Sequence, residues 1–229
     1  MSKFRQLMVV SLLSGAIAGL ASFAIQHFTV IPLIEVAETY EASAHAAMGM
    51  HEEEGWQPSN GWQRTSLTAL ANMLSGIGYA AVLFGVIGFA GIPTDLKRGA
   101  LLGLAAFACV GLAPALGLPP QPPGVPVADL QDRQLWWAGT AAATAAGLWL
   151  LFGSARGQRR IWLFRIAGTA CIVLPHLIGP PLAMPNHVVP ISIVHKFEFA
   201  SLATIGIFWL VLGAIGGALL SRYQAQPTR

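Results

Sequence analysis

The sequence predicts an all-α, polytopic membrane protein with six transmembrane helices. Hydrophobic residues make up 55% of the 229-residue chain, and charged residues only 10%. Six apolar stretches, each long enough to cross about 30 Å of hydrocarbon as a helix, follow one another along it. Little room is left for a soluble domain, so residues 1–229 are expected to form a single integral membrane domain. We place the spans at about 7–34, 66–92, 100–118, 135–153, 163–182 and 199–221, with an external loop at 35–65.

The first apolar stretch follows Lys3 and Arg5, a pattern shared with cleaved signal peptides. It runs for about 25 residues, which is longer than the apolar core of a signal peptide. The small-residue sequence Ala42-Ser43-Ala44 lies too far downstream to be the cleavage site. We therefore predict a retained membrane helix.

Basic residues gather on one side of the predicted membrane. Ten of the 13 lie in the tails and in alternate loops, whereas Arg64, Arg133 and Lys196 lie on the opposite side. The positive-inside rule then predicts cytoplasmic N- and C-termini and a multi-pass protein of the inner (cytoplasmic) membrane. The same rule accounts for the basic pI of about 9.2, so no nucleic-acid partner is implied. All six histidines and nine of the ten carboxylates fall on the external side.

A run of acidic and metal-ligating residues follows the first span. Its members are spaced by three or four residues, so a helix continuing from that span would place them along one face. They are Glu35, Glu38, Glu41, His45 and Met48, followed by Met50, His51 and three glutamates. Imidazole and carboxylate groups suit first-row divalent cations, and thioether sulfur adds softness. The segment is a candidate capture site for a metal cation, and a solvated acidic loop is the alternative.

His176 lies inside the fifth span, directly after Pro175. A proline leaves the carbonyl four residues earlier without its helical partner, and a histidine at such a break can face a cavity. Ionisable groups inside a membrane are costly and tend to be functional. His176 is therefore a candidate ligand of a deeper metal site, together with His27 or Glu198. A histidine satisfied by a neighbouring hydroxyl or carbonyl is the alternative.

Three further patterns concern packing. Residues 118–126 contain five prolines, which predict a stiff, extended excursion, and Trp136 and Trp137 are expected to anchor the membrane interface. Residues 108–120 recur, one residue shorter, as 170–181, which suggests a parallel repeat of helix hairpins; chance similarity of apolar segments is the alternative. Pairs of glycines four residues apart predict close helix contacts. These pairs are Gly15 and Gly19, Gly99 and Gly103, and Gly213 and Gly217.

Several of these pieces together resemble the CbtA family of predicted cobalt transporter subunits, nearly end to end. The matching positions are Pro32-Leu33 with Glu38, Tyr40 and Glu41; Trp56 and Pro58 with Gly61, Arg64 and Thr65; Leu112 to Pro120; Arg133-Gln134 with Trp136-Trp137; and Pro175-His176 with Gly179 and Pro181. The resemblance implies a small single-span partner, a CbtB-like subunit, and a link to cobalamin synthesis. The chain departs from the family pattern at Gln121, where a glutamate often follows the double proline.

The sequence therefore predicts a membrane subunit for uptake of a divalent transition metal. Co²⁺ is the expected cargo and Ni²⁺ the alternative, because metal affinities follow the metals more than the site. No permanently bound cofactor and no enzyme activity are expected, and the chain has no phosphate-binding loop of the nucleotide-hydrolysing type. Membrane lipid surrounds the chain, and a homo-oligomer is a further option. The alternatives are a membrane metal-binding accessory protein that transports nothing, and a membrane redox or haem protein.

Overall fold

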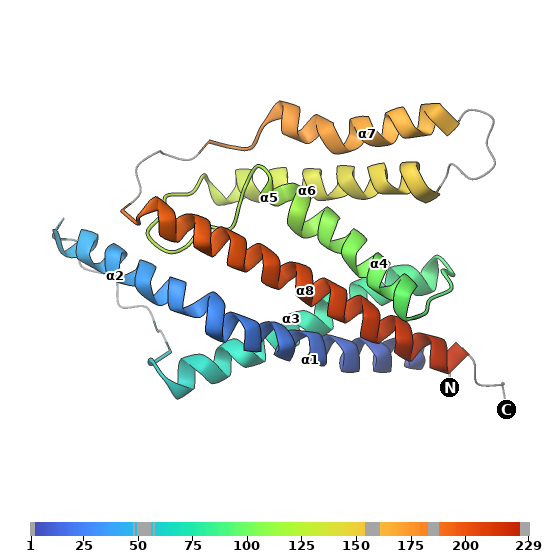
Figure 1. Ribbon diagram of the computed structural model, residues 1–229, viewed down its shortest axis with the longest axis horizontal. Helices are drawn as coiled ribbons and strands as arrows, with labels where there is room; N and C mark the ends of the chain where they lie inside the picture. Colours follow the sequence, from blue (N-terminus) through green and yellow to red (C-terminus); the bar gives the residue numbers. More distant parts are fainter. Residues whose placement is uncertain are drawn as a thin grey trace. The chain divides into compact units, whose positions relative to one another are not determined.

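The computed structural model describes residues 3–47, 49, 56, 58–153, 161–182 and 188–224, and this part of the chain is helical, with no strand. Six helical segments are long and apolar enough to cross a membrane. The predicted all-α fold with six candidate spans is therefore confirmed. In order, the helices and the π-helical turns η1 and η2 are α1 (Lys3–Thr29), α2 (Ile31–Ala47), α3 (Trp62–Phe89), α4 (Leu96–Phe107), η1 (Ala108–Leu112), α5 (Ala113–Ala115), α6 (Leu130–Leu148), η2 (Trp149–Gly153), α7 (Ile161–Ile178) and α8 (Ile191–Gln224) (Figure 1).

Several helices extend beyond the apolar stretches that predicted them. The last candidate span covers Ile191–Tyr223, although hydropathy alone suggested 199–221. Its added first turns carry His195, Lys196 and Glu198, and such polar residues lower the mean hydropathy without preventing helix formation. After the first span the chain remains helical through α2, as the spacing of its glutamates predicted.

Contacts within the chain group it into two compact units. Unit 1 comprises Met1–Pro32, His45–Leu104 and Ala203–Arg229, and unit 2 comprises Leu33–Ala44 and Ala105–Leu202. Each unit is described by itself. That all 229 residues act as one integral membrane domain stays a prediction.

In unit 1, α1 and α3 lie side by side (Figure 1). A β-carbon on Gly15 would lie 2.6 Å from the Gly76 carbonyl oxygen, so only glycine permits this approach. Towards the end of α1, Asn72 Nδ2 donates a hydrogen bond to Gln26 Oε1 at 3.0 Å. Small residues and amide hydrogen bonds are typical of contacts between membrane helices, because lipid provides no hydrophobic drive for their association.

The other two glycine pairs of unit 1 meet each other. A β-carbon on Gly99 would lie 2.8 Å from Gly217 Cα and would also overlap the Gly213 carbonyl oxygen. Gly103 likewise contacts Gly213. The glycines of α4 and α8 therefore form one close backbone contact, as their spacing predicted.

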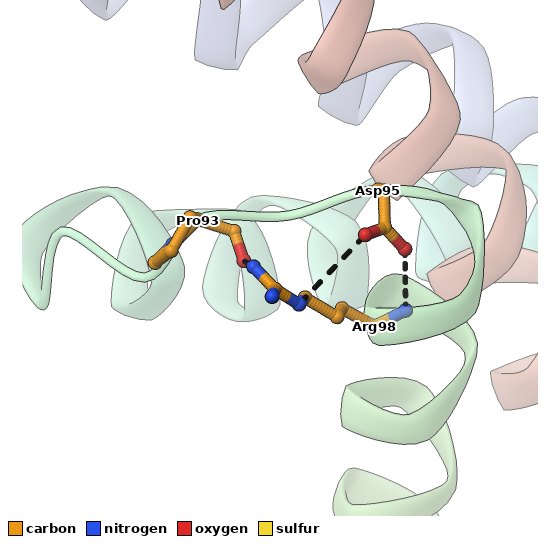
Figure 2. Close-up of polar contacts among 3 residues, drawn as sticks. All are labelled: Pro93, Asp95 and Arg98. Carbon is orange, nitrogen blue, oxygen red and sulfur yellow. Dashed lines mark hydrogen bonds and ion pairs between the residues drawn. The ribbon is translucent and has the colours of Figure 1, made fainter.

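The start of α4 is capped by Asp95, the one carboxylate that the sequence assigns to the cytoplasmic side. Asp95 Oδ1 accepts a hydrogen bond from the Arg98 backbone N–H at 2.9 Å, and Arg98 Nε lies 3.7 Å from Asp95 Oδ2 (Figure 2). The Arg98 guanidinium also donates to the Pro93 carbonyl oxygen at 3.4 Å. A carboxylate that accepts from the first turn satisfies an otherwise unpaired N–H and complements the helix dipole. Asp95 thus has a structural role.

In unit 2, α6 and α7 form an antiparallel pair (Figure 1). A β-carbon on Gly147 would lie 2.6 Å from both the Gly168 carbonyl oxygen and Ile172 Cγ1. At the other end of the pair, the rings of Trp136 and His176 are in edge-on contact, with centroids 6.0 Å apart. These two contacts fix the register of the helices.

The π-turn η1 lies in the longer of the two stretches that suggested a repeat and would account for its extra residue. In this turn the Ala113 N–H bonds to the Ala108 carbonyl, whereas residues 170–181 begin inside α7 and have no such turn. An i→i+5 hydrogen bond accommodates one extra residue per turn. The Val110 carbonyl has no N–H four residues on, because that position is Pro114, and Trp137 Nε1 donates to it at 3.0 Å. Whether the two stretches are copies of one helix hairpin stays a prediction.

Candidate functional site

The acidic residues after the first span lie on a helix with one buried face. Ala37 of α2 is fully buried in a cluster with Val189 and Val194. Glu38 and Glu41 are half-buried, whereas Glu35 is exposed. The two inner carboxylates thus lie at the edge of a packed helical face, which a freely solvated loop would not provide.

The proline-rich segment packs beside this face within unit 2. Gly124 turns there with a positive φ of 77°. A β-carbon on Gly124 would lie 3.3 Å from Glu41 Cβ and 3.1 Å from Val189 Cγ2. The turn therefore brings the rigid loop close to the base of the Glu41 side chain.

Glu198 is the centre of a second polar group, the Glu198 cluster, which consists of Glu198, Gln121 and His195. Gln121 Nε2 donates to Glu198 Oε1 at 3.0 Å, and His195 Nδ1 lies 3.1 Å from Glu198 Oε2. The Glu198 side chain is 20% exposed and that of His195 is 68% exposed. Each carboxylate oxygen thus has one partner, and each retains a lone pair that could bind a cation.

His176 lies in the last turn of α7, and its Nε2 is buried without a hydrogen-bond partner among the described residues. The helix runs through Pro175 and ends at Ile178, where the N–H of Gly179, at a φ of 88°, bonds to the Pro175 carbonyl at 3.0 Å. The expected break at Pro175 is therefore absent, and the helix ends one turn later in the left-handed glycine conformation typical of C-caps.

Trp136 forms one wall of the His176 environment. The far edge of its indole fits over Gly117, where a β-carbon would lie 2.5 Å from Trp136 Cη2 and 3.3 Å from Pro180 Cβ. Its Nε1 is also buried without a partner in the described part of the chain. An indole N–H can only donate, whereas a neutral imidazole Nε2 can accept. Water between the two groups could satisfy both, and a metal cation could bind only the imidazole.

Two of the remaining candidates are histidines near the ends of α1 and α2. His27 is exposed near the end of α1 in unit 1, with its ring 5.9 Å from that of Phe23 and 5.1 Å from that of Phe28. His45 is half-buried near the end of α2. Met48 and His51 fall outside the described residues.

No group of three His, Cys, Asp or Glu side chains that could hold a metal ion occurs within the ranges that the structure describes. A cation at any of these places would therefore complete its coordination with water, with backbone carbonyls or with residues outside those ranges.

Sequence reasoning missed two residues of these sites. Gln121 counted only as a departure from a family pattern, although it holds Glu198, which lies 77 residues further along the chain. Trp136 was expected only as an interface anchor, but it contacts His176. The double tryptophan gave no sign that its two members differ: Trp136 is half-buried, whereas Trp137 is exposed.

Comparison with known protein families identifies the family of this chain. A family model described as "Probable cobalt transporter subunit (CbtA)" matches residues 4–221, nearly the whole chain. No curated protein and no solved structure matches the chain.

Proposed function

Because the chain belongs to the CbtA family of probable cobalt transporter subunits, we propose that it carries a cobalt cation across the inner membrane into the cell. The observation that carries this proposal is His176, whose Nε2 is buried on a candidate membrane span with no partner among the described residues. An ionisable group in such a place is costly and is usually retained for function. In the proposed orientation, both termini are cytoplasmic.

Capture begins at the half-buried face of α2. Glu38 and Glu41 attract a hydrated divalent cation, and His45 offers a borderline nitrogen donor one turn further on. Met48 and His51, which follow α2 in the sequence, add a thioether and a second imidazole. The Glu198 cluster provides a second anionic station, since its carboxylate is only 20% exposed and is held by Gln121.

The deeper station is His176. A neutral imidazole nitrogen suits Co²⁺ better than it suits the hard cations Mg²⁺ and Ca²⁺, so this ligand selects a transition metal in a region of low water content. Among the described residues no group of three His, Cys, Asp or Glu side chains surrounds it, and in this proposal the cation keeps part of its hydration shell. Incomplete dehydration makes both entry and release easier.

Energy for entry is available without nucleotide hydrolysis by this chain. Moving a charge through 100 mV is worth about 2.3 kcal/mol, so a divalent cation gains about twice that on entering a cell with a negative interior. The family description as a subunit implies a partner, and we propose a small single-span CbtB-like protein in that role.

Cobalt uptake by proteoliposomes that contain this chain alone tests the proposal. His176→Ala should abolish uptake, because it removes the nitrogen donor. His176→Asn should abolish it too, since an amide can replace a hydrogen bond but is a poor ligand for Co²⁺. Leu177→Ala is the matched control, because this neighbour is 77% exposed on the same turn. Normal uptake by the Asn variant would leave His176 with a structural role only.

The same vesicles separate the alternatives. Cobalt binding without uptake by the unmodified chain would indicate a non-transporting accessory protein, or a transporter that requires its partner; adding the partner subunit distinguishes these two. A visible absorption band in the purified protein would indicate haem.

The capture step is tested by replacing Glu38, Glu41 and His45 together with alanine. This change should raise the cobalt concentration for half-maximal uptake and leave the maximum rate nearly intact, with Thr39→Ala, at an exposed position of α2 outside the acidic set, as the control.

A further inference from the structure

Three helix ends of unit 1 meet around the last turns of α3. A β-carbon on Gly88 would lie 2.7 Å from Leu7 Cδ1, so the start of α1 lies against the end of α3. One turn earlier on α3, the Phe84 ring occupies the place that a β-carbon on Gly216 would take, which brings the end of α8 to the same level. The start of α4 joins them through its glycine contact with α8. Figure 1 shows the N-terminus and the end of α8 at this end of the unit.

These helix ends carry a group of exposed basic side chains, which we call the basic face. Its members are Lys3, Arg5, Lys97, Arg98 and Arg222. Lys97 precedes by two residues the glycine of α4 that contacts Gly217, and Arg222 lies about 7.5 Å beyond Gly217 along α8. Residues distant in the sequence are therefore neighbours here.

The basic face has little negative charge of its own. Asp95 is the one carboxylate in the described residues of these helix ends, and it already pairs with Arg98. Five positive charges and one negative charge leave a net charge of +4 on this face. Like charges brought together repel one another, so the folded arrangement would gain from a bound anion.

Exposed apolar side chains border the same face. Phe4 lies between two of its basic residues, and Leu96 precedes Lys97. Phe89, at the end of α3, is 98% exposed. A soluble anion would complement only the charges of this surface. A phospholipid complements both kinds of group, because it presents phosphate oxygens next to acyl chains.

We propose that the basic face binds an anionic phospholipid of the surrounding membrane. Lys97 and Arg222 hold its phosphate, and its acyl chains lie against Phe4, Phe89 and Leu96. Basic groups at the ends of neighbouring membrane helices recognise lipid headgroups in this way. Such a lipid would bind whether or not the chain transports cobalt.

Lipid titration followed by native mass spectrometry tests this site on the full chain in detergent micelles. Cardiolipin, a diphosphate lipid, is the probe, and uncharged phosphatidylcholine is the comparison. Lys97→Gln combined with Arg222→Gln removes the charges and keeps polar side chains. Each basic residue near an anionic surface strengthens binding about fivefold, so this double variant should bind cardiolipin about 25-fold more weakly.

The matched control removes the same charge from unit 2. Arg165→Gln combined with Lys196→Gln changes exposed residues on α7 and α8, and it should alter the affinity for cardiolipin less than about twofold. All four side chains are exposed, so both double variants should fold and elute as monodisperse peaks.

Three results would overturn the site. Equal weakening by the two double variants would mean attraction by net charge alone. Binding of phosphatidylcholine as tight as that of cardiolipin would make the basic residues irrelevant. Release of cardiolipin by an equal concentration of inorganic pyrophosphate would mean that a soluble anion suffices and that the apolar border contributes nothing.

Discussion

The hydrogen bond from Trp137 to the π-turn allows a quantitative test of how this fold accommodates a proline. Pro114 deprives the Val110 carbonyl of its α-helical donor, and Trp137 Nε1 supplies the bond at 3.0 Å from α6. Trp137→Phe keeps an aromatic ring, although a smaller one, and removes the donor. At the expected membrane interface little water is available to replace it, so the variant should lose about 1–2 kcal/mol of unfolding free energy.

Pro114→Ala supplies the missing N–H within the helix and should make the tryptophan donor redundant. Trp137→Phe should then cost little in that background, and the double-mutant cycle should give a coupling energy of about 1–2 kcal/mol, near the upper end for interhelical bonds in membranes. The assay is equilibrium unfolding of the four purified proteins in mixed micelles with increasing denaturing detergent, followed by circular dichroism. Trp162→Phe, at an exposed position of α7, controls for the change of ring. Equal costs of Trp137→Phe in both backgrounds would refute the compensation.

Three further predictions concern topology, packing and metal binding. With the native cysteines replaced, Asn60→Cys should be labelled in intact cells by an impermeant thiol reagent and Lys97→Cys should not; the reverse result would invert the orientation. Gly99→Leu should lower the free energy of unfolding by about 1–3 kcal/mol, because the new side chain would overlap the α8 backbone. The monodisperse fraction in size-exclusion chromatography should fall with it. Gly78→Leu is the control and should be tolerated, since nothing lies within 4 Å of a β-carbon at that site. Without metal, His176→Leu should be as stable as the unmodified protein or more stable, because it removes an unpaired buried nitrogen. Cobalt at 100 times its Kd should stabilise the unmodified protein by about 2.7 kcal/mol, and His176→Leu should lose this stabilisation. Thermal unfolding of both proteins with and without cobalt measures the difference.

Parts of the candidate site followed from local sequence, and others did not. The spacing of Glu38 and Glu41 predicted a shared helical face, because helix periodicity depends only on neighbours in the chain. The same pattern could not show that this face is half-buried, since burial depends on Val189 and Val194, more than 140 residues away. The position of His176 in an apolar span was likewise evident from sequence, but its contact with Trp136 was not.

The sequence by itself determined the six apolar helices, the distribution of basic and acidic residues, and the residue types available to a metal. These are properties of composition and of spacing over one or two helical turns, and an apolar stretch in lipid must become a helix because its backbone groups have no other partners there. Tertiary structure alone decided that Gln121 holds Glu198, that Trp137 completes the π-turn, and that Trp136 contacts His176. Such pairings depend on the register and rotation of helices against each other, and these are fixed by side-chain packing between segments distant in the chain.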